Sequence, residues 1–291
     1  MLNQKQRRLK TGDFSCAVTK QLIRQFRKKI WGYYRTHGRG FPWRKTRDPY
    51  RILVSEIMLQ QTQAGRVLKK YGPFLRRFPN FKSLAAAPTR SVLTAWQGMG
   101  YNRRALALKR IAEIVIQQHR GMLPSDPTAL QTLPGVGAAT AGAIAAFAFG
   151  KSAAFIETNI RRVFIHFFFP HKNNVRDAEI LALAARTLDT RRPREWHYAL
   201  MDYGAHLGKR LGGGTNPNRK SSRYRRQTAF KGSHRELRGK IISFLLHART
   251  PTESAIAARL EKPLAQIQRI LAALHREGFI VRKGRRIRLA R

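Results

Sequence analysis

The sequence contains few acidic residues: 15 Asp and Glu stand against 58 Lys and Arg in 291 residues, a formal net charge of +43. An imbalance of this size makes the folded chain repel itself, and binding to a polyanion relieves the repulsion. Nucleic acid is the first candidate partner, because each neutralised phosphate releases counterions. An anionic membrane surface and a highly basic host proteome are the alternatives that charge alone leaves open.

Cysteine is nearly absent as well, since Cys16 is the only one. A single cysteine excludes an internal disulfide and any zinc or iron–sulfur site held by several cysteines, and it fits a reducing cytosol. No apolar run reaches the roughly 20 residues that span a bilayer. The basic start of the chain, MLNQKQRRLK, lacks the apolar stretch of a secretory signal. We therefore expect a cytoplasmic protein, in a bacterial cytosol or nucleoid, with no membrane partner.

Strand-like alternation is scarce, and most of the chain has the three- and four-residue apolar spacing of helices. We expect residues 1–16 to form a basic N-terminal arm and residues 17–208 to form an all-α domain of many short helices. Residues 209–232 contain three consecutive glycines and many basic residues, which is typical of a linker. Proline and glycine predict the breaks between helices, among them Gly40–Pro42, Gly72–Pro73, Gly98–Gly100 and Pro134–Gly137.

Residues 233–291 predict a second, small domain. Ser233 and Thr252 can each cap a helix, and the apolar residues of a third helix, over about 264–275, fall on one face. The segment FIVRKGRRIRL then alternates on both sides of Lys283–Gly284, which predicts a basic β-hairpin. Three helices and a hairpin are the elements of a winged helix-turn-helix. The basic hairpin favours this interpretation over a helical dimerisation tail.

The segment LPGVGAATAGAI, residues 133–144, predicts two helices joined by a tight turn. Gly135 and Gly137 allow the turn, and the small residues after them leave backbone N–H groups exposed at the start of the next helix. Such a turn can bind a phosphate directly, or through a bound monovalent cation, without contacting a base. The alternative is a helix–helix corner in which glycine only permits close packing.

A second segment, SEIMLQQTQ at residues 55–63, carries one carboxylate, Glu56, in mostly apolar surroundings. Desolvation raises the pKa of a carboxyl group in such surroundings. A carboxyl group that stays protonated near neutral pH can act as the general acid for a basic leaving group. The alternative for Glu56 alone is a solvated or ion-paired residue on a helix surface.

Several segments, in their order and spacing, resemble the helix-hairpin-helix base-excision DNA glycosylases. They are FPWR (41–44), DPY (48–50), SEIMLQQTQ (55–63), WQGMGY (96–101), LPGVGAATAGAI (133–144) and NIRRV (159–163). The resemblance covers about residues 28–208 and is closest to the MutY-type adenine glycosylases, which remove adenine mispaired with 8-oxoguanine or guanine. The motif SE-x-MLQQTQ is specific to that branch, whereas LPGVG occurs across the superfamily, including endonuclease III. The implied protein is a monomer that excises a flipped base from mispaired or damaged double-stranded DNA.

The resemblance also implies roles for individual residues. Glu56 matches the acid that protonates the leaving adenine, and Gln61 matches the side chain that enters the duplex. Trp43, Arg44 and Leu59 fall near the expected base pocket, although Trp43 can also simply pack and Arg44 can contact phosphate. The DNA-binding residues that the resemblance implies are Leu133, Gly135, Val136, Gly137 and Asn159.

Glu157 occupies the position of a family aspartate, in ETNIRRV where relatives have a segment like DGNVxRV. Breaking an N-glycosidic bond builds positive charge on the sugar, and a nearby carboxylate stabilises that charge. Glutamate keeps the charge but reaches one methylene further, and a misplacement of about 1 Å can lower a rate ~100-fold. This departure implies weak activity or a pocket shifted to suit another base. The alternative role for Glu157 is that of a helix N-terminal residue favoured by the dipole.

Other departures bear on the chemistry. Ala139 stands where lyase-active relatives have the Schiff-base lysine, so a monofunctional glycosylase is implied. MutY-type relatives often have Tyr or Ser there, which weakens the adenine assignment. The cluster cysteines of the family would fall at Gly208, Thr215, Asn218 and Tyr224, so a clusterless member that needs no cofactor is implied. The domain that reads 8-oxoguanine in relatives is replaced here by the winged helix, which leaves the opposite base open.

The sequence leaves three functions open. The first is an adenine glycosylase, and the second is a glycosylase for mismatched thymine, uracil or another damaged base. The third is a catalytically inactive protein that binds DNA lesions. The retained Glu56 and Glu157 argue against the third, because a pure binder has no reason to hold carboxylates near phosphate. A membrane-surface or RNA-binding protein would not explain SEIMLQQTQ.

Overall fold

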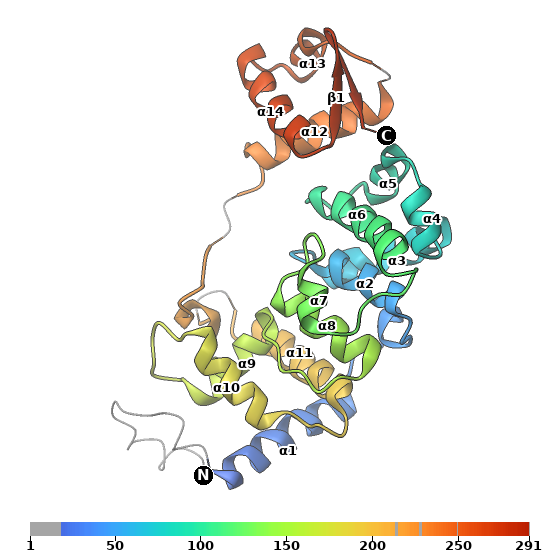
Figure 1. Cartoon of the computed structure of the whole chain (residues 1–291). Helices are drawn as coiled ribbons and strands as arrows, with labels where there is room; N and C mark the ends of the chain where they lie inside the picture. The colour runs from blue at the N-terminus through green and yellow to red at the C-terminus, as the bar shows by residue number, and fades with distance from the viewer. Residues whose placement is uncertain (1–18, 213–214, 227–228, 249, 291) are drawn as a thin grey trace. The chain divides into compact units, whose positions relative to one another are not determined.

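The computed structural model describes residues 19–212, 215–226, 229–248 and 250–290. The expected basic arm and Cys16 lie outside these ranges. Within them nearly all regular structure is helical, as the sequence predicts. Two short strands, β1 (Ile280–Lys283) and β2 (Arg286–Leu289), occur near the C-terminus (Figure 1). None of the described helices is long and apolar enough to cross a membrane.

The chain divides into two compact units, each built from two stretches of sequence. Unit 1 comprises the described residues up to Gly40 together with residues 150–225. Unit 2 comprises residues 41–149 together with the described residues from 226 onward. The all-α domain expected over residues 17–208 is therefore divided between both units, and the expected C-terminal domain belongs to unit 2.

Unit 1 has an aromatic core. The ring of Phe26 lies with its centroid 5.1 to 5.9 Å from those of Phe164, Phe168 and Trp196. Aromatic rings at this spacing, packed edge-on or tilted, stabilise a core beyond the area that they bury. The described elements of unit 1 are α1 (Lys20–His37), α9 (Thr158–Phe168), α10 (Asp177–Thr187), α11 (Pro193–Arg210) and the 3-10 helix η3 (Pro217–Lys220).

The segment around η3 is folded, although the sequence predicts a linker over residues 209–232. Asn218 is buried, and its side-chain amide donates a hydrogen bond to the carbonyl of Thr158 at 3.0 Å. The backbone N–H of Val175 donates to the carbonyl of Lys220 at 2.8 Å. This part of the linker prediction is wrong, because contacts with residues far away in the sequence bury a polar segment that composition alone assigns to solvent.

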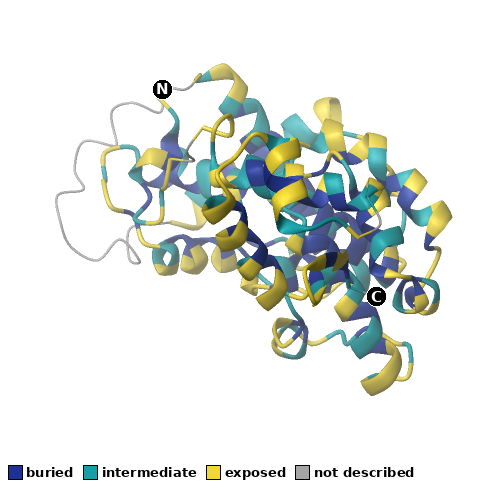
Figure 2. Cartoon of the chain, turned by 90° about the horizontal axis from the view of Figure 1, so that it is seen from above, coloured by how far each residue is buried: buried dark blue, intermediate teal, exposed yellow. Residues whose placement is uncertain are grey.

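The first stretch of unit 2 is wholly helical in its regular structure. Its buried residues, dark blue in Figure 2, include the side chains of Ile52, Leu53, Phe74 and Trp96. Helix α2 lies within this core and packs against α3 and α8. The elements are the 3-10 helix η2 (Pro42–Arg44), α2 (Pro49–Leu59), α3 (Ala64–Arg77), α4 (Phe81–Ala86), α5 (Thr89–Trp96), α6 (Arg103–Gln118), α7 (Pro127–Gln131) and α8 (Ala138–Phe149).

The break predicted at Gly72–Pro73 is wrong, because α3 runs through both residues. Proline inside a helix removes one backbone hydrogen bond to the carbonyl four residues earlier. Here Pro73 and Lys69 both lie on the exposed side of α3, where water can satisfy the freed carbonyl. The buried side chains Val67, Tyr71 and Phe74 hold the opposite side of the helix in place.

The C-terminal stretch of unit 2 contains the three helices and the hairpin that the sequence predicts: α12 (His234–His247), α13 (Glu253–Leu260), α14 (Leu264–Arg276) and the antiparallel pair β1–β2. The predicted caps are confirmed. Ser233 accepts a hydrogen bond from the N–H of Glu236 at 3.3 Å, and Thr252 accepts one from the N–H of Ala255 at 3.2 Å. These side chains fix the start of each helix by satisfying an otherwise unpaired backbone donor.

Candidate active site

Helix α2 carries Glu56 in unit 2. Asp48 caps the start of the helix by accepting a hydrogen bond from the N–H of Arg51 at 2.8 Å, and Pro49 occupies the first helical position. Ser55 and Ile57, on either side of Glu56 in the sequence, are fully buried, while Glu56 itself is half-buried. Apart from Glu56, every residue from 52 to 58 is buried, so Glu56 is the one half-buried side chain in this part of the helix.

Arg104 of α6 holds the other end of α2. One guanidinium nitrogen, Nη1, donates to the carbonyls of Ile57, Met58 and Gln60 at 3.0, 2.7 and 2.6 Å. A cation beside the last carbonyls of a helix is favoured by the helix dipole as well as by the hydrogen bonds. Burial lowers the pKa of the Arg104 guanidinium to about 10, so it remains charged at neutral pH.

The same guanidinium also holds the loop that precedes α6. Its second nitrogen, Nη2, donates to the hydroxyl of Thr62 at 2.9 Å and to the carbonyls of Met99 and Gly100 at 3.2 and 3.1 Å. The guanidinium carbon Cζ of Arg104 lies 5.3 Å from the ring centroid of Trp96. One buried side chain therefore fixes both the segment after Glu56 and the glycine-containing loop.

Gln61 stands directly after this fixed helix end. It is exposed, and its backbone has φ 52°, a left-handed conformation that is uncommon for a residue other than glycine. Its neighbour Gln60 points elsewhere: the side-chain amide donates to the carbonyl of Gly135 at 3.0 Å and to the hydroxyl of Thr140 at 3.1 Å. The end of α2 and the glycine turn are thereby joined, and Gln61 is presented to solvent beside them.

The glycine turn between α7 and α8 has the hairpin form that the sequence predicts. Leu133 and Val136 are buried and anchor it, whereas Gly135 and Gly137 are exposed. Gly135 has φ 78°, a backbone conformation that favours glycine, and a Cβ there would make a tight contact of 3.2 Å with the Cβ of Ala107. An exposed backbone at the start of α8 can bind phosphate.

Glu157 lies in unit 1 as the cap of α9. Its Oε1 accepts hydrogen bonds from the backbone N–H groups of Asn159 and Ile160 at 2.7 and 2.8 Å, and its Oε2 accepts one from the Asn159 side chain at 3.2 Å. Burial raises the pKa of the Glu157 carboxyl, and these hydrogen bonds, together with the charge of Arg162, oppose the rise. The helix-cap role that the sequence left as an alternative is therefore confirmed.

A polar network behind Glu157 was not predicted from the sequence. Arg162 donates to the side chain of Asn159 at 2.9 Å, to the carbonyl of Gly204 at 2.7 Å and to the side chain of Asn216 at 3.3 Å. Gly204 permits the close approach of α11 to α9, because a Cβ there would lie 2.3 Å from the carbonyl oxygen of Asn159. The only signal in the sequence was the Gly204–Gly208 spacing, which places two glycines on one face of a helix.

The remaining candidates have mixed environments. Trp43 is 3% exposed and stacks on Phe41 with ring centroids 4.7 Å apart, so it packs as its alternative interpretation predicts. Arg44, Leu59 and Ala139 are half-buried. The roles of Arg44 and Leu59 at a base pocket, like the DNA-binding role of Asn159, stay predictions. Among the described residues, no three His, Cys, Asp or Glu side chains are grouped closely enough to hold a metal ion.

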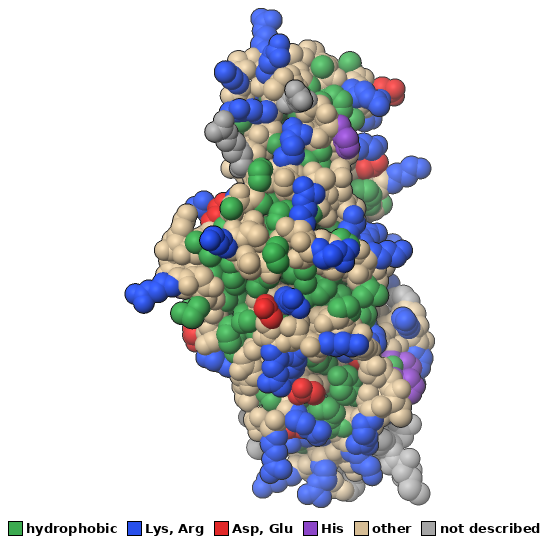
Figure 3. Space-filling model, turned by 90° about the vertical axis from the view of Figure 1, so that its right-hand side faces the viewer, with side chains coloured by type: hydrophobic (Ala, Val, Ile, Leu, Met, Phe, Trp, Pro, Cys, Tyr) green, Lys and Arg blue, Asp and Glu red, His purple; other side chains and the backbone are tan. Residues whose placement is uncertain are grey.

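The candidate residues thus fall into two groups. Unit 2 joins α2, with Glu56 and Leu59, to Gln61 and the hairpin from Leu133 to Gly137. Unit 1 holds Glu157 and Asn159 at the start of α9. On the face drawn in Figure 3, Lys and Arg side chains are widespread while Asp and Glu are sparse.

Comparison with known proteins decides the family. The family model of the HhH-GPD superfamily base excision DNA repair proteins matches residues 54–185. An adenine DNA glycosylase of Mycobacterium tuberculosis is 34% identical over 277 residues, which cover 86% of this chain and 88% of that protein. The chain belongs to the HhH-GPD superfamily. An adenine DNA glycosylase of Buchnera aphidicola is 36% identical over 185 residues, but the match spans 62% of this chain and only 52% of that relative.

The superfamily fold is also found in the solved structure of a thermostable thymine-DNA glycosylase. It matches with a TM-score of 0.58 and 32% sequence identity, covering 65% of this chain and 88% of the other. The match to the superfamily model begins within α2 and ends within α10, so it includes Glu56, the hairpin and Glu157. The residues expected to form the winged helix, 233–291, lie outside it.

Proposed function

We propose that this protein is a DNA glycosylase that hydrolyses the N-glycosidic bond of an adenine flipped out of duplex DNA, with 8-oxoguanine or guanine as the opposite base. The observation that carries the proposal is the position of Glu56. It is a half-buried carboxylate among buried residues of α2, and Gln60 ties the end of that helix to the hairpin. The names of two relatives, both adenine DNA glycosylases, support adenine as the substrate.

In the proposed reaction Glu56 donates its proton to the leaving base as the bond between the base nitrogen and C1′ of the sugar breaks. Glu157 remains ionised and stabilises the positive charge that builds on the sugar. The oxygen of a water molecule bonds to C1′, and a proton of that water passes to the carboxylate of Glu56. The products are the free base and an abasic site, and Glu56 is again protonated.

The surroundings of Glu157 support its part in this reaction. Two backbone N–H groups and the Asn159 amide hold the carboxylate, and the network of Arg162 fixes Asn159 in turn. A carboxylate held in this way keeps its orientation when a flipped nucleotide approaches, which favours a preorganised site. Glutamate in place of the family aspartate lengthens the side chain by one methylene, and these hydrogen bonds hold the longer side chain in one orientation.

The other elements take parts that follow from their chemistry. The exposed backbone of Gly135 and Gly137 binds a phosphate of the DNA backbone, directly or through a monovalent cation. Gln61 enters the duplex next to the flipped base. Ala139 supplies no amine, so the strand is left uncut. We further propose that the enzyme acts as a monomer in a bacterial cytosol, without an iron–sulfur cluster.

A panel of duplexes tests the proposal. Purified protein is incubated with end-labelled duplexes that contain adenine opposite 8-oxoguanine, adenine opposite guanine, thymine opposite guanine or uracil opposite guanine, and abasic sites are then cleaved with alkali. We expect strand breaks from the two adenine duplexes, and only after alkali. Breaks without alkali would contradict the monofunctional assignment. Tight binding without any product would favour the inactive lesion-binding protein.

A second candidate is excision of thymine or uracil from a mismatch with guanine. The similarity to the thymine-DNA glycosylase structure favours it. So do Glu157, which replaces the family aspartate, and Ala139, which stands where MutY-type relatives often have Tyr or Ser. In the same panel, breaks from the thymine or uracil duplexes and none from the adenine duplexes would replace the first proposal by the second.

A further inference from the structure

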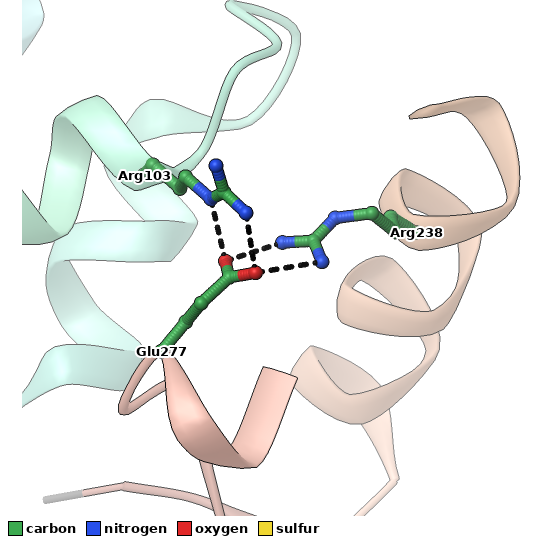
Figure 4. A network of polar contacts seen from close by, with 3 residues as sticks. All are labelled: Arg103, Arg238 and Glu277. Carbon is green, nitrogen blue, oxygen red and sulfur yellow. Dashed lines mark hydrogen bonds and ion pairs between the residues drawn. The ribbon is translucent and has the colours of Figure 1, made fainter. Parts of the chain in front are cut away.

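The C-terminal part of unit 2 is fastened to α6 by a carboxylate shared between two arginines (Figure 4). Glu277, directly after α14, accepts two hydrogen bonds from Arg103 of α6 at 2.7 and 2.6 Å and two from Arg238 of α12 at 3.0 and 2.6 Å. Arg235 of α12 adds a hydrogen bond to the hydroxyl of Tyr101 at 2.7 Å. Helix α12 and the end of α14 therefore hold this region against α6. We call this contact, made by Arg103, Arg238, Glu277, Arg235 and Tyr101, the α6 contact.

The α6 contact leaves another side of α14 exposed. Its apolar residues Ile267, Ile270, Leu271 and Leu274 are fully buried, whereas Gln268, Arg269, Ala272 and Arg276 are exposed along the opposite side. Residues at this spacing share one helical stripe. The stripe combines cationic ends with a small alanine at its centre, so a partner can approach the helix closely.

The hairpin continues this stripe. A groove with a volume of about 570 Å³ is lined by residues of α14 and β1: Arg269, Ala272, His275, Arg276 and Arg282. Lys283 and Arg285, at the tip of the hairpin, are exposed beside it. We call the surface formed by Arg269, Ala272, Arg276, Arg282, Lys283 and Arg285 the α14–hairpin face.

The acids of this region do little to neutralise that face. Residues 233–291 contain 14 Lys and Arg but only four acids, all glutamates. Glu277 is already paired with Arg103 and Arg238 in the α6 contact. Glu236 pairs with Lys240 at 2.9 Å on α12. Glu253 pairs with Arg282 at 3.2 Å and is the one acid with a described contact to the α14–hairpin face. Glu261 lies in the turn before α14.

We propose that the α14–hairpin face is a second binding surface for duplex DNA, separate from the helix-hairpin-helix turn. The inference rests on the proposed function for its substrate, a DNA duplex. An exposed α-helix fits the major groove of B-DNA. The adjoining hairpin, with Lys283 and Arg285 at its tip, then reaches the neighbouring phosphates. Each phosphate that a basic side chain contacts adds affinity that falls as salt rises.

The test removes three charges from the face and compares them with three removed elsewhere. The first variant of the full chain carries Arg269→Ser, Arg276→Ser and Arg285→Ser. The control variant carries Arg24→Ser, Lys28→Ser and Arg35→Ser, which are exposed residues of α1. Affinity is measured against salt concentration for an undamaged duplex of about 30 base pairs and one of about 10, roughly a single helical turn. Thermal unfolding confirms that both variants are folded.

On the longer duplex we expect the first variant to bind roughly 10- to 100-fold more weakly near physiological salt, with a salt slope reduced by about 2 to 3. The control is expected to keep the slope of the parent. On the shorter duplex, too short to occupy both surfaces, the difference between first variant and parent should shrink. Equal slopes for the first variant and the control would overturn the inference.

Two further readouts separate this inference from the proposed function. If no duplex in the panel loses a base but the salt slope still drops in the first variant, the proposed function fails and the DNA surface stands. If base release occurs and the first variant binds DNA like the parent, the inference alone fails. Should poly-L-glutamate bind the parent, but not the first variant, while DNA affinity is unchanged, the face would instead fit an acidic protein.

Discussion

Replacing Arg104 with methionine removes six hydrogen bonds from the end of α2 and the loop before α6. Methionine has a similar length and can fill the space beside Trp96, so the change removes the charge and the donors rather than the volume. Arg104 is 8% exposed, which means that water cannot readily replace it. The carbonyls of Ile57 and Met58, both in buried residues, would lose their guanidinium partner.

The expected magnitude follows from these contacts. A hydrogen bond to a charged group contributes about 1.5 to 3 kcal/mol, and the release of a buried guanidinium returns part of that sum through its desolvation cost. We expect a net loss of about 3 to 5 kcal/mol in the free energy of unfolding. For a chain of this size that loss lowers the Tm by about 10 °C. Because Gln61 and Glu56 depend on the same helix end, the single-turnover rate should fall about 10- to 100-fold at 25 °C.

The assay is thermal unfolding with two companion variants. Arg104→Lys keeps the charge but not the planar fork, so roughly half of the loss should be recovered. Arg110→Met, on the same helix, removes an arginine that is 71% exposed and lies 3.6 Å from Glu113, and it should change stability by less than about 0.5 kcal/mol. An Arg104→Met protein that unfolds within about 2 °C of the parent would refute the assignment of Arg104 as the clamp of this site.

The remaining predictions concern Glu277 in the α6 contact, the packing of α9 against α11, and the pH profile of base release. Hydrogen bonds from Arg103, then from Arg238, hold the pKa of Glu277 at about 2. Because this lies below the ordinary 4.5, the stabilisation is complete above pH 4.5 and is lost as the pH falls toward 2. Glu277→Gln should therefore lower the free energy of unfolding by about 1 to 2 kcal/mol at pH 7, measured by denaturant unfolding. The difference between variant and parent should largely disappear near pH 2, and a difference that persists there would contradict this linkage. Gly204→Ala, whose Cβ would meet the Asn159 carbonyl at 2.3 Å, should cost about 2 to 4 kcal/mol, and an unchanged Tm would show that α9 and α11 can separate freely. Burial raises the pKa of Glu157 above the ordinary 4.5. As the pH falls, the rate of base release should therefore begin to decline above pH 4.5. A rate that stays constant down to pH 4.5 would contradict a role for ionised Glu157.

Local signals predicted most of the helical framework. Ser233 and Thr252 mark helix starts by side-chain chemistry that acts within three residues, and the spacing of apolar residues in α14 needs no knowledge of the rest of the fold. The glycine turn at Gly135 was predictable for the same reason, since its left-handed backbone is a local feature that favours glycine. Glu56 could be recognised because it interrupts an otherwise apolar run.

Contacts between distant residues account for what the sequence could not predict. Arg103 and Arg104 are adjacent and chemically identical, yet one bridges to Glu277 and the other is buried against α2. The difference arises because successive helical residues point about 100° apart, so the fold decides which one faces inward. Asn218 is buried in a stretch whose composition is typical of a linker, because its partner Thr158 lies 60 residues earlier. Proline at position 73 also misled, since its cost depends on exposure.

Single-turnover release of adenine shows whether Glu56 acts as the general acid. Parent and Glu56→Gln proteins are compared at saturating concentrations on a duplex with adenine opposite 8-oxoguanine, and duplex affinity is measured separately. Glutamine has the same shape but no acidic proton. Loss of general acid catalysis should therefore lower the rate by about 10²- to 10⁴-fold while affinity is retained. Equal rates of adenine release from the two proteins would mean that Glu56 donates no proton to the departing base.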